Sequence, residues 1–522
     1  MATARSDAQP RVQTAPGSGN AHYLIRFLLS LSAALPALFA CSAWAAKWDI
    51  VPTLAVVETY TDNLNLSQDE TKQSDWVTQI IPGISITATG PRLKFNATYT
   101  PEAVYYVQAT ENNQIYQRGN AFGTAELAER LLFVDAGAGV DQYNVSLQGP
   151  ITTTNINTTG NRSTVRNYFV SPYLQRDFGA DFKAEARFTY SVVNSDDTAL
   201  LDNSVGDRVN LRFASGPAYR LLTWDLAYRK ETIDYETQGD TEIEVSNLNA
   251  RWLITSTVGL LAQGGYEYYK SGVIPPTEGP SWSAGLEWAP SPRTRIAATA
   301  GQRFYGDAYS FDFNHRTRLT TWSAGYSQNV TTARADFFIP ATTSTAGYLN
   351  TLFSQRFPDP VARQKAVEEF ITRTGIPPSL SDPINVFTSQ LFLEKRWNAS
   401  AGILGVRNVL IANVFKQTRE GLAGELVLPT APNANIQTGT SLLWNWRMSA
   451  QNAWNLVASY SRNETPNTGE IAYLSYVGMG LTRQFQPRLS GSLNYRLQQN
   501  DSNFNGADYT ENAVIATLQM RF

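Results

Sequence analysis

The end of the chain constrains its fold most strongly, because residues 512–522 alternate strictly in polarity and finish on an aromatic side chain. Successive side chains of an extended strand point to opposite faces. One face is apolar and carries Val514, Ala516, Leu518, Met520 and Phe522. The other face carries Thr517, Gln519 and Arg521. Such a strand can turn its apolar face to lipid and hold its terminal aromatic ring at the membrane interface.

A terminal strand of this kind is typical of outer-membrane β-barrels. Similar C-termini are the signal that the barrel-insertion machinery recognises. We therefore expect Phe522 to be the insertion signal of this chain. The expected partners are that machinery and outer-membrane lipid, including lipopolysaccharide.

The two-residue period recurs from Trp48 onward, and a helical period does not fit runs such as 488–498. The runs are joined alternately by short turns, ten in all, and by longer polar loops, eleven in all. This alternation predicts an all-β fold, a transmembrane antiparallel outer-membrane β-barrel of about 22 strands with both termini in the periplasm of a Gram-negative bacterium. A soluble β-propeller or sandwich would need neither the alternation nor the terminal aromatic residue, and a β-solenoid would need a fixed repeat.

The positions of the connections are also predicted. Short turns are expected near 330–331 and 398–399, among others. Longer loops are expected near 271–280 and 306–314, among others.

Residues 1–45 are expected to be a secretory signal peptide, and residues 46–522 the barrel domain. The apolar run 27–40 is too short for a comfortable membrane span, and Ala43 and Ala45 offer small side chains for cleavage. A retained membrane anchor is the alternative. Removing this segment changes 42 basic and 45 acidic residues to 39 and 44, a net charge of −5. This balance provides no basic surface for nucleic acid.

Cysteine chemistry is not expected in the mature chain. The single cysteine, Cys41, lies within the predicted signal peptide. A lipoprotein cleavage site is the alternative there, although Phe39 suits it poorly. Without cysteine, the barrel cannot form disulfides, thiolate nucleophiles or cysteine-ligated zinc sites. We expect no cofactor and no metal, although acidic loops near 196–207 and 234–244 leave calcium binding as an alternative to a hydrated surface.

An enzyme is not expected either. The mature chain keeps only His315, with Asp307 and Asp312 nearby in sequence. An Asp–His pair that activates water at the barrel rim is the one catalytic alternative, and a solvated histidine is the plainer interpretation. Plugged transporters of similar strand number carry an N-terminal plug domain, and because the strand pattern starts at Trp48 we expect none here.

Residues 341–383 interrupt the strand pattern with a short helix in an outside loop. Asp359 suits the N-cap, Pro360 the first helical position and Gly375 the stop. An apolar stripe is formed by Ala362, Ala366, Val367, Phe370 and Ile371. This stripe must be buried, either in the barrel mouth as a gate or against neighbouring loops.

Several short motifs resemble the outer-membrane β-barrel family associated with the PEP-CTERM/exosortase system, which occurs with exopolysaccharide biosynthesis loci. The N-terminal motifs are Trp48-Asp-Ile-Val-Pro-Thr-Leu54, Glu58-Thr-Tyr-Thr-Asp-Asn63 and Ile80-Ile-Pro-Gly83. The later motifs are Phe357-Pro-Asp-Pro360, Glu368-Glu-Phe370, Gly375-Ile-Pro377 and Arg407-Asn408. The resemblance implies partners among exopolysaccharide export or biosynthesis proteins, and it implies no catalytic residues.

Polar side chains on the predicted inward rows are candidates for a lumen lining. They are Arg208, Asn210, Arg212, Arg293, Arg295, Arg303, Arg488, Asn494 and Arg496. Arginine and asparagine on a lumen wall suit polar, hydroxyl-rich or anionic chains. The alternative is that these arginines pair with carboxylates across the lumen and only solvate it.

Two functional hypotheses follow. The first is a passive pore or accessory in exopolysaccharide export, in which the polysaccharide rests on the resemblance alone. The second is a non-conducting structural or receptor-like barrel that anchors surface polymer or periplasmic partners.

Overall fold

The computed structural model describes residues 46–146, 149–196, 202–237, 239–272, 274–338, 391–422, 434–504 and 506–522, with seven helical residues between 349 and 370. The predicted signal peptide and most of the predicted insert lie outside the described residues. Within the described residues, no helix is long and apolar enough to span a membrane.

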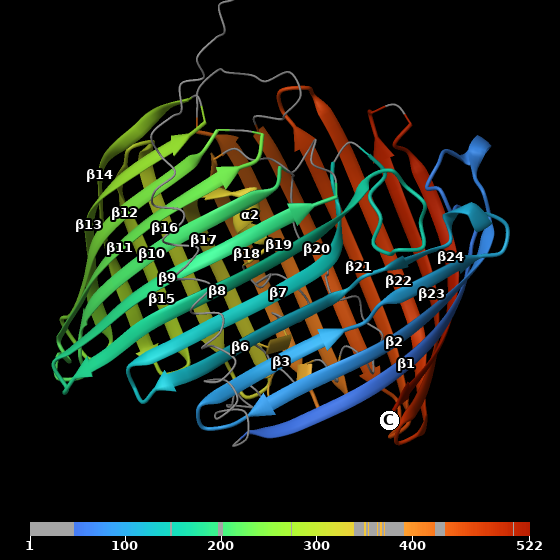
Figure 1. Cartoon of the computed structure of the whole chain (residues 1–522), viewed down its shortest axis with the longest axis horizontal. Coiled ribbons are helices and arrows are strands. Elements are labelled where there is room, and N and C mark those ends of the chain that lie inside the picture. Colours follow the sequence, from blue (N-terminus) through green and yellow to red (C-terminus); the bar gives the residue numbers. More distant parts are fainter. Residues whose placement is uncertain are drawn as a thin grey trace, which may run out of the picture.

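The described chain is almost entirely strand (Figure 1). The first twelve strands are β1 (Lys47–Thr61), β2 (Asp75–Thr89), β3 (Leu93–Tyr99), β4 (Glu102–Tyr106), β5 (Gln114–Tyr116), β6 (Gly119–Ala128), β7 (Leu132–Asn144), β8 (Arg162–Phe178), β9 (Phe182–Ser195), β10 (Ser204–Ser215), β11 (Leu222–Tyr235) and β12 (Thr241–Leu253). The other twelve are β13 (Val258–Ser271), β14 (Ile274–Ser291), β15 (Thr294–Arg303), β16 (Gly306–Arg316), β17 (Thr320–Thr332), β18 (Leu391–Leu404), β19 (Asn408–Gly421), β20 (Ala434–Arg447), β21 (Asn452–Thr465), β22 (Glu470–Gln486), β23 (Leu489–Ser502) and β24 (Tyr509–Arg521). The short helices are η1 (Asp69–Thr71), η2 (Thr110–Asn112) and α2 (Ala333–Asp336).

These 24 strand segments form a closed antiparallel barrel of 22 strands. β2 pairs first with β3 and then with β4, so β3 and β4 are one barrel strand interrupted at Pro101. β5 pairs with β4 in the same way that β6 pairs with β3, so β5 extends β6. The interruption has a local cause, because proline has no N–H group for the strand ladder. The predicted fold class and strand number are confirmed.

The barrel closes where the first strand meets the last. β1 pairs with β24 in antiparallel register from Thr53 opposite Arg521 to Thr61 opposite Ala513. Closure leaves no barrel strand with an unpaired edge, which a lipid environment requires. The two predicted faces of the terminal strand are present, with Val514, Leu518, Met520 and Phe522 exposed on the outer surface.

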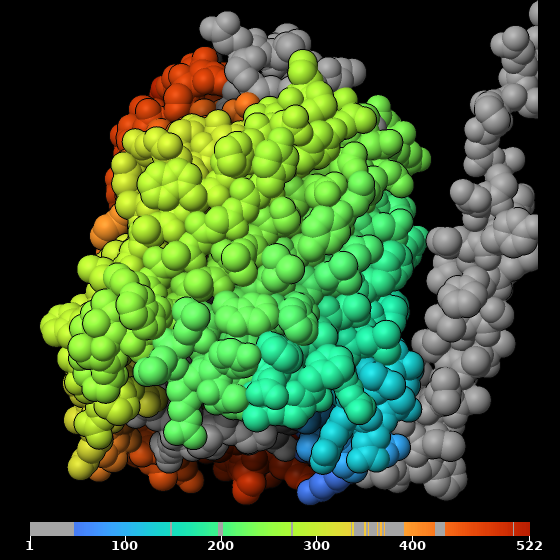
Figure 2. Space-filling view, turned by 90° about the vertical axis from the view of Figure 1, so that its left-hand side faces the viewer, coloured from blue at the N-terminus to red at the C-terminus, as the bar shows by residue number. Residues whose placement is uncertain are grey.

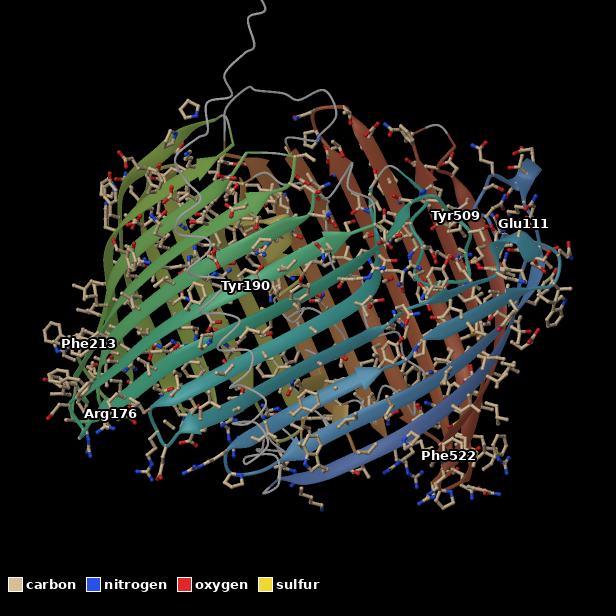
Figure 3. All side chains as sticks on the ribbon, viewed as in Figure 1. Glu111, Arg176, Tyr190, Phe213, Tyr509 and Phe522 are labelled. Atoms are coloured by element: carbon tan, nitrogen blue, oxygen red, sulfur yellow. The ribbon has the colours of Figure 1, made fainter. Side chains whose placement is uncertain are left out.

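We call the end that carries the short turns the turn end, and the opposite end the loop end. Phe522 lies at the turn end, where the C-terminus is marked in Figure 1 and the side chain is labelled in Figure 3. Most of the connections lie close to their predicted positions, but four do not. Residues 330–331 and 398–399 lie inside β17 and β18, and the actual turns are 317–319 and 405–407. Much of 271–280 and all of 306–314 belong to β14 and β16, whose loop-end turns are tight.

Aromatic side chains ring the outer surface at two levels. Five of the eight exposed tryptophans among the described residues lie toward the turn end, and these are Trp48, Trp252, Trp288, Trp322 and Trp446. Exposed tyrosines gather toward the loop end, and these are Tyr60, Tyr168, Tyr190, Tyr266 and Tyr460. Figure 2 shows the outer wall between these levels, over the green and yellow-green strands, as a continuous surface. Two aromatic girdles flanking an apolar band define the lipid-facing belt of an outer-membrane barrel.

A charge placed inside this belt should destabilise the barrel. Leu518 is 50% exposed and lies on β24 midway between the level of Val514, which pairs with Tyr60, and the terminal Phe522. We expect Leu518→Arg to lower the free energy of unfolding by about 2–4 kcal/mol, because the guanidinium would face hydrocarbon. Urea titration of the protein folded in lipid vesicles measures this change.

The matched control is Gln519→Arg, because Gln519 follows Leu518 on β24 and its side chain faces the lumen. We expect this variant to unfold near the wild-type midpoint. Equal destabilisation by the two variants would contradict the assignment of the faces.

Candidate functional site

The connection after β17 enters the lumen. The strand ends at Thr332, whose Oγ1 accepts a hydrogen bond from the backbone N–H of Ala335 at 3.3 Å and caps the single turn α2. A threonine oxygen in this position satisfies one of the free N–H groups at a helix start. Figure 1 shows α2 inside the barrel, enclosed by the surrounding strands.

Arg334 of α2 binds a distant part of the wall. Its Nε donates to Ser204 Oγ of β10 at 2.9 Å, and its Nη2 donates to the carbonyl oxygen and Oγ of Ser191 of β9 at 2.8 and 2.9 Å. Gly206 makes room for the guanidinium, because a Cβ there would lie 2.8 Å from Arg334 Nη1. The side chain is 2% exposed, and burial lowers the pKa of its guanidinium from the ordinary value. Its hydrogen-bond partners on the wall are neutral, and Glu231 and Asp207 offset part of the effect of burial on the pKa through their charge.

The residues after α2 extend the same contact. Phe337 packs with Val145, Val165 and Val193, and its carbonyl oxygen accepts a hydrogen bond from Asn167 Nδ2 at 3.0 Å. These partners belong to β8, β9 and the start of the β7–β8 loop, whereas the chain has just left β17. Strands β11 to β16 lie between β10 and β17 around the wall. The chain therefore bridges the lumen from one part of the wall to another, and we call residues 333–338 the bridge.

Helical residues of the predicted insert pack on a different part of the lumen wall. Leu349, Phe353, Val367 and Phe370 form one buried cluster with wall residues of β19 to β21. The rings of Phe353 and Phe370 meet edge to face with centroids 5.6 Å apart. The wall residues of this cluster are Val409, Ile411, Leu443 and Val457.

Part of the predicted apolar stripe of the insert lies within the described residues. Val367 and Phe370 are buried in this cluster, which includes wall residues, and Ala366 packs against it. Ala362 and Ile371 lie outside the described residues. A gating role for this helix remains a prediction.

The β7–β8 loop occupies a third part of the lumen, beside the closing strands. Ile151 and Ile156 are each 2% exposed. The carbonyl oxygen of Ile151 accepts from Gln498 Nε2 of β23 at 2.6 Å, and that of Ile156 accepts from the Tyr106 hydroxyl of β4 at 2.8 Å. The loop is therefore fixed to the wall by buried hydrogen bonds.

Glu511 connects this loop to the closure of the barrel. Its Oε1 accepts from Thr61 Oγ1 of β1 at 2.8 Å, from Asn157 Nδ2 of the loop at 2.9 Å and from Arg496 Nη2 of β23 at 2.8 Å. The side chains of Arg496 and Glu511 are 3% and 0% exposed. One carboxylate of the last strand therefore holds the first strand, the neighbouring strand and the internal loop together.

A cavity of about 1600 Å³ remains beside the bridge. Ala335, Phe337 and Phe338 of the bridge form part of its lining. Of the predicted lumen residues, Arg208, Asn210, Arg212 and Arg303 line it as well. This cavity is the candidate ligand site of the protein.

Most of the predicted lumen arginines form ion pairs. The pairs are Arg208 with Glu231 at 2.6 Å, Arg212 with Asp225 at 3.6 Å, Arg295 with Glu287 at 3.0 Å, Arg303 with Glu267 at 2.8 Å and Arg496 with Glu511 at 2.8 Å. These arginines thus pair with carboxylates, as the alternative interpretation expects, but the partners lie on the same or nearby parts of the wall and not across the lumen.

The remaining predicted residues lie apart from the cavity. Asn494 donates to Ser492 Oγ at 3.0 Å on β23. Arg293 and Arg488 lie in turns at the turn end. Arg496 belongs to the buried closure. The nine predicted residues therefore do not form one site.

His315 does not form the suggested catalytic pair. Its Nδ1 lies 2.9 Å from Thr294 Oγ1, and it is paired across strands with Trp322 on the outer face near the turn end. Asp312 instead accepts a hydrogen bond from Asn314 and lies 3.7 Å from Arg295, on the lumen side. Odd and even residues of β16 face opposite sides of the wall, so Asp312 cannot reach His315. Asp307 shares the face of His315 but lies at the other end of β16, where it accepts a hydrogen bond from the Tyr309 hydroxyl at 3.4 Å. Among the described residues, no group of three or more potential metal ligands is present.

Comparisons with known proteins identify no family. No protein-family model matches the chain, and no curated protein is similar to it. The FrpB iron transporter from Neisseria meningitidis is 9% identical with a TM-score of 0.49, and the match covers 91% of this chain and 82% of that one. The siderophore receptor PirA from Pseudomonas aeruginosa is 9% identical with a TM-score of 0.44, with 91% and 80% covered. These likenesses are too weak to carry an argument about function, and the fold rests on the strand pairing of this chain.

Removing the carboxylate of Glu511 should destabilise the closure. In Glu511→Ala, we expect the free energy of unfolding to fall by about 3–5 kcal/mol, because the Arg496 guanidinium stays buried without its anion. Urea titration followed by heat-modifiable gel mobility measures this change.

Glu129→Ala is the matched control, because it breaks an exposed ion pair with Arg92 at a turn. We expect this variant to lose about 1 kcal/mol or less. If Glu511→Ala were as stable as Glu129→Ala, the proposed role of Glu511 in closure would be wrong.

Proposed function

We propose that this protein is a receptor-like outer-membrane barrel that holds a polar ligand in a lumen occluded by its own bridge. The observation that carries this proposal is the docking of Arg334 on Ser191 and Ser204 across the lumen. Barrels of this strand number are wide enough to need a plug. Here the internal segments that the structure describes supply that blockage from the chain itself.

An open export pore is less well supported by this geometry. For a polymer to pass, the bridge would have to leave the wall. That movement would break the hydrogen bonds of a buried guanidinium and expose the apolar cluster around Phe337. The lost hydrogen bonds and the exposed apolar surface both oppose this movement, so the bridged state should dominate.

The chemistry of the cavity supports a hydroxyl-rich ligand. Asn210, Asn247, Ser283 and Gln328 line it together with arginines, so it offers both donors and acceptors. Surface polymer is our proposed ligand, and its connection with exopolysaccharide export and the PEP-CTERM/exosortase system rests on the sequence resemblance. We place the turn end and both termini in the periplasm, because short turns face that side in such barrels.

Ion conductance in a planar bilayer tests the occlusion. We expect folded wild-type protein to conduct little, because the bridge, the β7–β8 loop and the helical residues around Phe370 occupy much of the lumen. Replacing Arg334 and Phe337 together with alanine should raise the conductance several-fold by releasing the bridge.

Arg176→Ala is the control, because this side chain lies at the outer turn end, as Figure 3 shows, and should leave the conductance unchanged. A large, steady conductance of the wild-type protein, like that of an open barrel, would contradict the proposal.

A further inference from the structure

The described lining of the lumen cavity is positively charged, although the chain is acidic. Eight arginines line it against five carboxylates. The whole chain has a net charge of −3. The excess of arginine is therefore a property of the cavity and not of the protein as a whole.

Two carboxylates that line the cavity together with Arg229 are already engaged. Glu231, two residues along β11, accepts from Arg208 Nη2 at 2.6 Å. Glu267 accepts from Arg303 at 2.8 Å through both Nε and Nη2. Arg229 faces the same cavity, and its buried Nε has no hydrogen-bond partner. The ion pairs of its neighbours thus leave this guanidinium incompletely satisfied.

On β18, a second arginine also has a guanidinium that is incompletely satisfied. Glu394 accepts from Arg419 Nε at 3.0 Å and also binds the amide of Gln417. Arg396, two residues along β18, lines the cavity, and its buried Nη2 has no hydrogen-bond partner. A buried donor without a partner in a native protein requires an explanation, and a bound ligand is one.

We propose that the cavity binds a saccharide that carries carboxylates, with Arg229 and Arg396 as its anchors. This inference rests on the proposed function and specifies the chemistry of its ligand. The planar guanidinium presents several N–H donors in a fixed fork that matches a carboxylate. Because the two arginines belong to β11 and β18, one acidic sugar unit at each position would require a ligand of several units.

Binding to detergent-purified, folded protein by isothermal titration calorimetry tests this proposal. The probes are hexagalacturonate, which carries a carboxylate on each unit, maltohexaose as the neutral counterpart, and citrate as a small polycarboxylate. We expect hexagalacturonate to bind at least tenfold more tightly than maltohexaose. Arg229→Gln and Arg396→Gln should each weaken hexagalacturonate binding about tenfold and leave maltohexaose binding unchanged, because each removes one charge-assisted contact.

Arg176→Gln is the control variant and should bind like the wild-type protein. Equal affinity for the two hexasaccharides, unchanged by the lumen variants, would overturn the acidic ligand and leave the proposed function standing. Tighter binding of citrate than of hexagalacturonate would overturn the saccharide. Failure of all three probes to bind folded protein would count against both the inference and the proposed function.

Discussion

The pairing of β1 with β24 is the constraint on which the rest of the structure depends. In lipid, a strand edge cannot hydrogen bond to water, so the sheet must close upon itself. The register from Thr53 opposite Arg521 to Thr61 opposite Ala513 provides this closure at the two ends of the chain. Glu511 reinforces it from the lumen side, where its carboxylate binds Thr61. The terminal strand thus stabilises the fold in three ways: its backbone pairs with β1, its outer face contacts lipid and its inner face carries Glu511.

Closure determines what the lumen must contain. With apolar rows facing lipid, polar and charged side chains are directed inward, and a ring of 22 strands encloses more space than these side chains can fill. The described chain fills part of it with the β7–β8 loop, the bridge and the helical residues around Phe370. Each packs an apolar cluster against the wall, so the blockage is part of the folded core. The cavity that remains is lined by the bridge, the β7–β8 loop and the wall, with arginine in excess among its charged residues.

The features that depend on the order of neighbouring residues could be predicted from the sequence. The alternation of Val514 to Phe522 predicted the two faces of β24, and the connection lengths predicted the number of strands. The turns at 317–319 and 405–407 were missed because the alternation of polarity alone does not mark where a strand ends. The site depends on residues distant in sequence, so Arg334 could not be matched with Ser191. Arg229 could have been found by extending the alternation along β11, but its lack of a partner depends on Arg208 and Glu231.

The most direct test of the account is a cross-link between the bridge and the distant wall. The only native cysteine, Cys41, lies in the predicted signal peptide, so pairs can be introduced freely. Phe337→Cys combined with Val193→Cys should form an intramolecular cross-link with a short bis-maleimide in intact membranes. Phe337→Cys combined with Val457→Cys, on the wall that carries the insert, should not. Absence of the first cross-link in folded protein, or equal yields from both pairs, would contradict a lumen bridged by its own chain.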